Sequence, residues 1–304
     1  MVFFSLVFFS SLTSGLQVSL ELEKAAVKIS DEPRMFVIDD FLSDDEIEKI
    51  GELADGGWEQ VSPTHSTCLL DQYDKLAKSV VMQQLDERMA KLLNFPLENI
   101  EHGFIQRYQG GFDMHNIHLD QNPATMEPQR QVSAIIFLDD QPLASGHTVF
   151  PMARIEGETA QVEKTCQMVS APVLKKDRAH SAVCTNPTIH LADALGVETE
   201  KLALGWNQVL TRGWYTRELY SDSPAEGGDM FRLVKRMCSA GYGVRPKKGR
   251  VVFFYNFDVH GKEAIRALHG SCYLTHDAPV KRALVKLACS GAVRDTSYWR
   301  KTEL

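Results

Sequence analysis

Hydrophobic and polar positions alternate along this chain with two different periods, one typical of helices and one typical of strands. Ser43 is followed three residues later by Glu46, which is the spacing of a capping box, and apolar residues then recur at helical intervals. This pattern predicts a helix that begins at Ser43. Apolar residues close to helical spacing predict a second helix over Tyr73–Leu93.

Other apolar residues fall in short runs separated by glycine, asparagine and aspartate, which is typical of strands and turns. One run precedes both predicted helices, and the rest follow Glu101. The predicted strands are Met35–Ile38, Phe104–Tyr108, Val132–Leu138, His147–Phe150, Val251–Phe254, Ala264–His269 and Ala283–Leu287. Helices followed by many short strands favour a mainly β fold, a sandwich or barrel braced by N-terminal helices.

Residues 156–240 interrupt the strand pattern with loop-like stretches and helical candidates at Ile189–Glu218 and Asp229–Cys238. Strand-type sequence resumes at Tyr242 and completes the earlier pattern. We therefore interpret 156–240 as a long helical and loop insertion, and we predict a single domain over residues 33–304.

Both ends of the chain carry features of secretory proteins. Met1–Leu12 is apolar and is followed by small residues up to Gly15, which predicts a signal peptide over residues 1–15. The run is too short to span a bilayer, so we expect no stable membrane span. The last four residues, Lys301–Leu304, resemble the K-D-E-L retrieval signal with one substitution. Together the two ends predict the lumen of the endoplasmic reticulum.

Composition narrows the classes of protein further. The 304 residues are 44% hydrophobic, which excludes wholesale disorder, and the net charge of −7 disfavours nucleic acid as a partner. Six cysteines without C-x-x-C spacing favour neither a disulfide scaffold nor a paired zinc motif. In an oxidising compartment several of them can pair, and the connectivity stays open. We interpret Cys272 as a buried packing residue and His147 as a polar surface group.

His118 and Asp120 are the sharpest candidates for chemistry. Residues two apart on a strand point to the same face, so both side chains can converge on one point, although an isolated H-x-D also occurs as two surface residues. His269, placed at the end of the predicted strand Ala264–His269, supplies a third ligand. Two histidines and one carboxylate form the facial triad of non-haem iron oxygenases.

Lys281 is a candidate for binding an anion. If the chain turns back near Thr275, an antiparallel return places Lys281 across from His269, on the same face as Ala283 and Val285. A lysine on an apolar face needs an anionic partner, which the carboxylate of a ligand supplies. A slip of one residue would place Arg282 there instead.

These motifs, in this order, resemble the prolyl 4-hydroxylases among the 2-oxoglutarate- and iron-dependent dioxygenases. The resemblance covers nearly the whole chain apart from the insertion. The matching segments are Phe36–Ser43, Arg107–Phe112 with His118 and Asp120, Gly146–Pro151, Val244–Gly249 with Val252–Phe254, and Leu268–Cys272. The resemblance implies a double-stranded β-helix, or jelly-roll, barrel.

The resemblance also implies a site and a reaction. Fe(II) would be held by His118, Asp120 and His269, and Lys281 would pair with the distal carboxylate of 2-oxoglutarate. Tyr108 and Thr148 would line the cosubstrate site. Peptidyl proline would be hydroxylated with O2, releasing succinate and CO2, and L-ascorbate would restore the iron.

Several departures from the family pattern leave alternatives open. Tyr273 replaces a proline, His147 replaces a glycine, Arg282 stands where many members have tryptophan, and about two extra residues precede Lys281. Alternative functions are a sister oxygenase acting on lysine or a small molecule, or a silent module that binds peptides. Any partner subunit stays unidentified.

Overall fold

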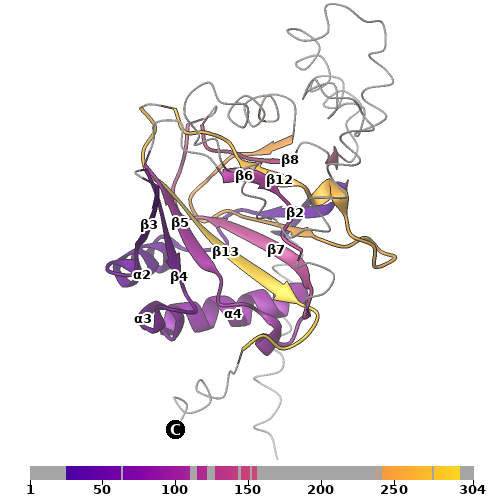
Figure 1. Ribbon diagram of the computed structural model, residues 1–304, viewed down its shortest axis with the longest axis horizontal. Coiled ribbons are helices and arrows are strands. Elements are labelled where there is room, and N and C mark those ends of the chain that lie inside the picture. Colours follow the sequence, from indigo (N-terminus) through magenta and orange to yellow (C-terminus); the bar gives the residue numbers. More distant parts are fainter. Residues whose placement is uncertain are drawn as a thin grey trace, which may run out of the picture.

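The computed structural model describes residues 25–62, 64–109, 115–121, 127–142, 145–150, 153–155, 238, 242–275 and 277–294. In these residues the chain is mainly β, with two antiparallel sheets and a few helices on one side (Figure 1). This confirms the predicted fold class. The predicted signal peptide, nearly all of the insertion and the C-terminal tetrapeptide lie outside the described residues.

Two sheets contain the strands of the described residues. The larger sheet has the order β3-β4-β5-β13-β7-β11-β2-β1-β9, and the smaller has the order β10-β8-β12-β6. The strands of the larger sheet are β1 (Val27–Glu32), β2 (Arg34–Ile38), β3 (Glu59–Ser62), β4 (His65–Leu69), β5 (Phe104–Tyr108), β7 (Arg130–Phe137), β9 (Arg154–Ile155), β11 (Val251–Tyr255) and β13 (Lys281–Cys289). Those of the smaller sheet are β6 (His115–His118), β8 (Thr148–Phe150), β10 (Tyr242–Val244) and β12 (His269–Ser271).

The chain crosses repeatedly between the two sheets. From β5 to β8 each strand lies in the sheet opposite its predecessor, and β11, β12 and β13 alternate in the same way. The last strand, β13, inserts between β5 and β7 and pairs with both. The last strand of this series is therefore hydrogen-bonded to the first, β5. This double crossing is the topology of a jelly roll, as the family resemblance implied.

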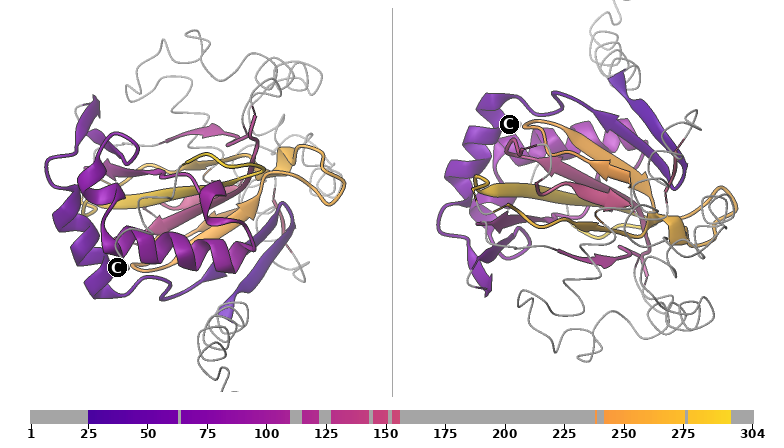
Figure 2. Two further views of the ribbon diagram at one scale, coloured as in Figure 1. Left: turned by 90° about the horizontal axis from the view of Figure 1, so that it is seen from below. Right: turned by 90° about the horizontal axis from the view of Figure 1, so that it is seen from above.

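Helices cover the outer face of the larger sheet, as the views in Figure 2 agree. Helix α2 (Asp44–Ala54) begins as predicted, with the full capping box between Ser43 and Glu46. The second predicted helix is wrong as a continuous element, because it divides into α3 (Asp74–Ala77) and α4 (Val80–Leu93). The Ser79 hydroxyl caps α4 and ends the preceding turn, which overrides the near-continuous apolar spacing.

The predicted strand Ala264–His269 is also wrong. A short 3-10 helix, η2 (Ile265–Ala267), occupies its centre, and His269 begins strand β12 instead of ending a strand. Another 3-10 turn, η1 (Leu97–Asn99), follows α4. The other predicted strands are found with bounds within about two residues, the usual uncertainty of such ends.

Alternation along the strands of the larger sheet divides its side chains between two cores. Ile136 and Leu284 face the helices, whereas Phe137 and Val285 face the smaller sheet. The second core holds Phe150 from β8 as well, so it lies between the two sheets. The space between the two sheets is separated from the helices by the larger sheet. Polar side chains that point into this space can form a site.

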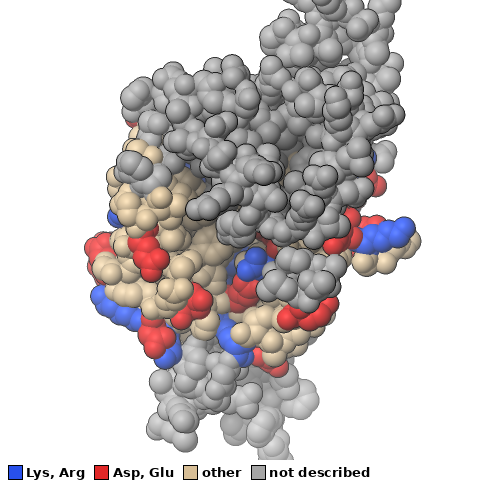
Figure 3. All heavy atoms as spheres, in the orientation of Figure 1, with Lys and Arg blue, Asp and Glu red and all other residues tan. Residues whose placement is uncertain are grey.

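The surface carries charges of both signs. On the face seen in Figure 3, acidic and basic side chains of the described residues are interspersed and do not gather into a patch of one sign. Within the same residues, no helix is both long and apolar enough to cross a membrane.

A buried ion cluster joins α4 to β13. Asp86 lies 2.7 Å from both Lys286 Nζ and Arg294 Nη1, and all three side chains are almost completely buried. Asp86→Ala leaves two buried cations without their carboxylate, so we expect unfolding free energy to fall by about 3–5 kcal/mol. Urea unfolding followed by circular dichroism measures this. Gln84→Ala, on the exposed face of the same helix, is the control and should change stability by less than about 0.5 kcal/mol.

Candidate metal and anion pocket

His118, Asp120 and His269 come together where two strands of the smaller sheet pair. His118 ends β6, and His269 begins β12 directly opposite it. Asp120 follows β6 by two residues, so its carboxylate lies beside the two rings although it is outside the strand. The ring centroids of the two histidines are 4.4 Å apart. Strand pairing thus brings together residues that are far apart in the sequence.

The three side chains present ligand atoms toward one point. Asp120 Oδ1 lies 3.2 Å from His118 Nε2, and Asp120 Oδ2 lies 3.5 Å from His269 Nε2. One atom from each residue lies within 4.8 Å of the others. Two imidazole nitrogens and one carboxylate on one side of a point leave the other side free for further ligands, which is the donor set of a facial triad.

Protonation of the triad suits a metal. Burial favours a neutral carboxyl, but His269 and His118 outweigh it and hold the pKa of Asp120 well below its usual range. Burial is the main cause that lowers the pKa of His269 to about 4. At neutral pH the site therefore holds an ionised carboxylate and a neutral His269 imidazole, the forms that bind metals.

Hydrogen bonding also fits a metal at this point. His269 Nδ1 lies 3.0 Å from the Ala267 carbonyl oxygen, which leaves Nε2 free to face Asp120. Asp120 Oδ2 is buried and accepts no hydrogen bond from the described residues. A buried carboxylate oxygen without a donor calls for an electrophilic partner, and a divalent cation provides one.

Lys281 lies at the other end of the same pocket. Its side chain is buried, and its Nζ donates a 2.6 Å hydrogen bond to Ser271 Oγ. The Tyr108 ring lies 5.4 Å from Nζ, and that of Phe137 lies 5.9 Å away. No carboxylate of the described residues pairs with this ammonium, and burial lowers its pKa to about 7. The pocket therefore offers a cation that an anionic ligand would complete.

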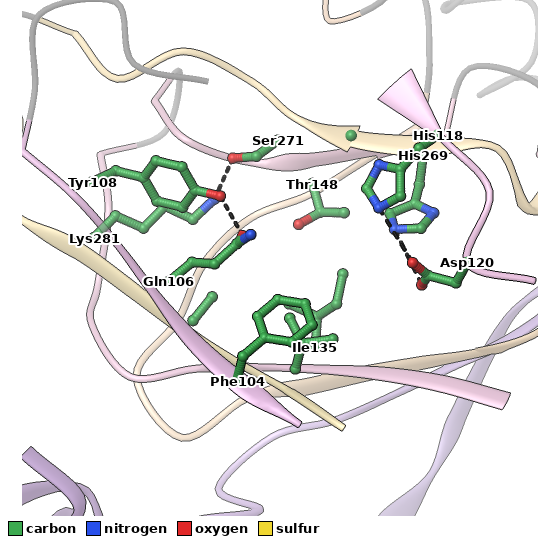
Figure 4. Close-up of a pocket in the computed structure, with 13 residues that line it drawn as sticks. Phe104, Gln106, Tyr108, His118, Asp120, Ile135, Thr148, His269, Ser271 and Lys281 are labelled. Atoms are coloured by element: carbon green, nitrogen blue, oxygen red, sulfur yellow. Dashed lines mark hydrogen bonds and ion pairs between the residues drawn. The ribbon is translucent and has the colours of Figure 1, made fainter. Parts of the chain in front are cut away.

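Figure 4 shows the two ends facing each other across Thr148. At the end of the pocket that holds Lys281, the Tyr108 hydroxyl donates a hydrogen bond to Gln106 Oε1. The walls of the pocket between the two ends are largely apolar. Its lining residues are Phe104, Gln106, Tyr108, His118, Asp120, Ile135, Thr148, His269, Gly270, Ser271, Lys281, Ala283 and Val285.

The structure places Lys281 in the pocket by a different route from the one predicted. Lys281 does not pair with His269, because β13 belongs to the larger sheet and pairs there with Tyr108 of β5. It reaches the pocket from the sheet opposite His269. Arg282, the alternative, points away and forms an ion pair with Asp139 at 2.7 Å.

Two polar residues of the pocket were not predicted. Ser271 lies two residues after His269 on β12, and Gln106 lies two residues before Tyr108 on β5. Strand alternation from the neighbouring candidate would have indicated each of them. A predicted strand that ends at His269 leaves Ser271 outside it, so the alternation does not extend to Ser271.

Cys272 is buried in the second core, as predicted, and it also forms a disulfide with Cys238, a pairing that the sequence left open. The interpretation of His147 as a surface group is wrong. His147 is half-buried, and its Nε2 lies 3.1 Å from Cys272 Sγ. Two other cysteines, Cys68 and Cys289, are buried and unpaired in the described part of the chain.

Fold and site together define a jelly-roll protein with a two-histidine, one-carboxylate group and a buried lysine in one pocket. No model of a known protein family matches the sequence, and no curated protein sequence matches it.

Solved structures do resemble the fold. A viral collagen prolyl hydroxylase from Paramecium bursaria Chlorella virus-1 is 15% identical, with a TM-score of 0.44, over 88% of this chain and 94% of that one. A Pseudomonas putida prolyl-4-hydroxylase is 11% identical, with a TM-score of 0.42, over 90% and 98%. HygX from Streptomyces hygroscopicus, solved with nickel and 2-oxoglutarate bound, is 13% identical, with a TM-score of 0.39, over 85% and 84%. Similarity this low assigns no activity or substrate to this chain.

Proposed function

We propose that this protein is an Fe(II)- and 2-oxoglutarate-dependent dioxygenase that hydroxylates peptidyl proline. The observation that carries the proposal is the pairing of two ends in one pocket, the His118, Asp120 and His269 group facing a buried Lys281. 2-Oxoglutarate has a keto-acid end that chelates metals and a distal carboxylate that needs a cation. Its two ends match the two ends of this pocket.

Each residue has a defined part in this proposal. His118, Asp120 and His269 hold Fe(II), and Lys281 binds and orients the distal carboxylate with Ser271 beside it. Bound iron and 2-oxoglutarate supply the oxidising chemistry, with O2 consumed and succinate and CO2 released. Thr148 and Tyr108 position the cosubstrate between the two ends.

The walls of the pocket define where the reaction takes place. Phe104, Ile135 and Val285 line it with apolar surface, so a cosubstrate and substrate bound there would displace water from the metal end. Exclusion of water strengthens the interaction between Lys281 and a carboxylate, because the local dielectric is low. With water excluded, a C–H bond of the bound substrate is the group that lies next to the metal end and can be oxidised.

Proline as the substrate, ascorbate as the reductant and the lumen of the endoplasmic reticulum as the location are further parts of the proposal. The ordered motifs Arg107–Phe112, Gly146–Pro151 and Leu268–Cys272 support the proline substrate through their resemblance to prolyl 4-hydroxylases. The disulfide Cys238–Cys272 supports an oxidising compartment.

Succinate release tests the proposal directly. Purified protein with Fe(II), ascorbate and labelled 2-oxoglutarate should release succinate, and a proline-rich peptide should accelerate the release and gain the mass of one oxygen. Release that responds to lysyl peptides or small molecules instead would keep the oxygenase and reject proline. No succinate under any condition would reject the enzyme and favour a silent peptide-binding module.

Binding of 2-oxoglutarate should depend on pH through Lys281. With its pKa lowered to about 7 by burial, the free ammonium is charged below pH 7 and loses its proton above it. We therefore expect the Kd to be steady below pH 7 and to rise up to about tenfold per pH unit above it. Calorimetry with Mn(II)-loaded, oxygen-free protein measures this. Lys281→Arg keeps its charge throughout, so its Kd should stay flat between pH 7 and 9.

A further inference from the structure

A second cluster of potential metal ligands lies on the reverse side of the strands that carry the pocket. Thr148 of β8 pairs with Ser271 of β12, and both line the pocket. The next pair along these strands is His147 with Cys272, joined by a 2.8 Å hydrogen bond from the Cys272 amide to the His147 carbonyl. Because side chains alternate along strands, His147 and Cys272 point to the opposite face of the smaller sheet.

Three ligand-type groups meet on that face. His147 Nε2 lies 3.1 Å from Cys272 Sγ and 3.4 Å from the Cys238 carbonyl oxygen. The ring nitrogen and the two sulfurs all lie within 4.8 Å of one another. The three residues come from three separate segments of the chain, so the fold and not a local motif places them together.

The His147 ring is held in position by its surroundings. Gly243 of β10 lies against it, and a Cβ at this position would stand 2.5 Å from His147 Cδ2. The glycine therefore makes room for the ring beside the sheet. His147 itself and Tyr273, which directly follows Cys272, occupy two of the positions where this chain departs from the prolyl 4-hydroxylase pattern.

We propose that His147, Cys238 and Cys272 form a second metal site, which is created when the Cys238–Cys272 disulfide is reduced and which takes a thiophilic divalent ion such as Zn²⁺. Two thiolates and one imidazole are three of the four ligands of a tetrahedral zinc site, and water completes it. Two sulfurs on one zinc ion lie about 3.8 Å apart. Side-chain rotation provides this separation while the Cα atoms stay near their 5.8 Å distance.

The chemistry of formation balances with a dithiol as the reductant. A thiolate of the dithiol attacks the half-buried Cys238 sulfur, the S–S bond breaks, and Cys272 leaves as the thiolate beside His147. The second thiol of the reagent then displaces Cys238, and the reagent becomes a disulfide. Two electrons enter the protein, and the two cysteine protons are released when zinc binds.

Cobalt(II) is the probe for this site, because thiolate ligation gives a near-ultraviolet charge-transfer band that histidine and carboxylate ligands do not give. The full chain is titrated with Co²⁺ before and after reduction by dithiothreitol and removal of the reagent. We expect one equivalent of the thiolate band in the reduced protein alone. Cys238→Ser and Cys272→Ser should each lose half or more of it, and His147→Ala should weaken Co²⁺ affinity at least about tenfold.

Cys68→Ser is the matched control, since Cys68 is an unpaired, buried cysteine outside the cluster. It should leave the band unchanged. No band in the reduced wild type, or an unchanged band in Cys238→Ser, would overturn the proposal.

A measurement on the wild-type chain covers the case in which the serine variants fail to fold. Zn²⁺ should protect Cys238 and Cys272 of the reduced protein from alkylation, as mapped by mass spectrometry. Equal alkylation of both residues with and without Zn²⁺ would show that the disulfide is structural only.

Discussion

Asp120→Ala should lower succinate release from 2-oxoglutarate by more than about 100-fold, since even residues that only orient metal ligands cost 10- to 100-fold when removed. Among the described residues, the Asp120 carboxylate is the one anionic group beside both His118 and His269, and both imidazoles face it within 3.5 Å. Without it the donor set is two neutral or mutually repelling imidazoles. Rapid-quench assays with labelled 2-oxoglutarate measure the rate, and equilibrium dialysis measures Fe(II) binding.

Two further variants separate the causes of this loss. Asp120→Asn keeps the shape of the side chain but removes its charge, so it should weaken Fe(II) binding strongly while the fold is retained. Asp45→Ala removes an exposed carboxylate from the first turn of α2 and should leave both readouts unchanged. Succinate release by Asp120→Ala at close to the wild-type rate would contradict the assignment of Asp120 as a ligand.

Much of the candidate site could be predicted because its parts are local patterns. The H-x-D spacing of His118 and Asp120 is visible within three residues, and the strand Phe104–Tyr108 was predicted with its bounds. The capping box at Ser43 is likewise a contact between residues three apart. Patterns of this kind depend on short-range geometry, which the rest of the fold preserves.

The order of the strands could not be predicted from local patterns. Around Thr275 the chain has the signals of a hairpin, which would pair the strand of Lys281 with that of His269. In the jelly roll, β13 instead inserts between β5 and β7, where Leu284 and Ala288 pack against the helices and Ala283 and Val285 face the pocket. In this position both faces of β13 are buried. The free energy gained by that burial is available only when the two sheets and the helices are assembled.

The same argument applies to single residues. Whether Cys272 forms a disulfide depends on where Cys238 lies, and the two are 34 residues apart. Ser79 ends one helix and caps the next through its own hydroxyl, but the apolar spacing on either side of it continues without a break. The disulfide and the helix cap each depend on a single contact, so hydrophobic periodicity does not reveal them.

Lys281→Ala should raise the KM for 2-oxoglutarate by about 30-fold or more while changing kcat much less, because truncating one partner of a buried charge pair costs about 2–5 kcal/mol. The lysine lies at the end of the pocket away from the metal ligands, so it acts on cosubstrate binding and not on ligation (Figure 4). Steady-state assays over a wide range of 2-oxoglutarate concentrations separate the two constants.

Stability provides an independent check on this variant. Lys281 is buried, contacts Ser271 and aromatic rings, and has no carboxylate partner among the described residues. Removing such a charge relieves a desolvation cost, so Lys281→Ala should not lower the melting temperature. A raised KM without lost stability would therefore reflect the missing cation and not a damaged fold.

Arg282→Ala is the matched control, because it removes a cation from the adjacent position of the same strand. Arg282 points to the other face of β13 and pairs with Asp139. Its loss should leave the KM for 2-oxoglutarate unchanged, whereas a raised KM in Arg282→Ala together with a normal one in Lys281→Ala would reverse the assignment. The pair of variants thus tests which face of β13 looks into the pocket, since a shift of one residue exchanges the two side chains.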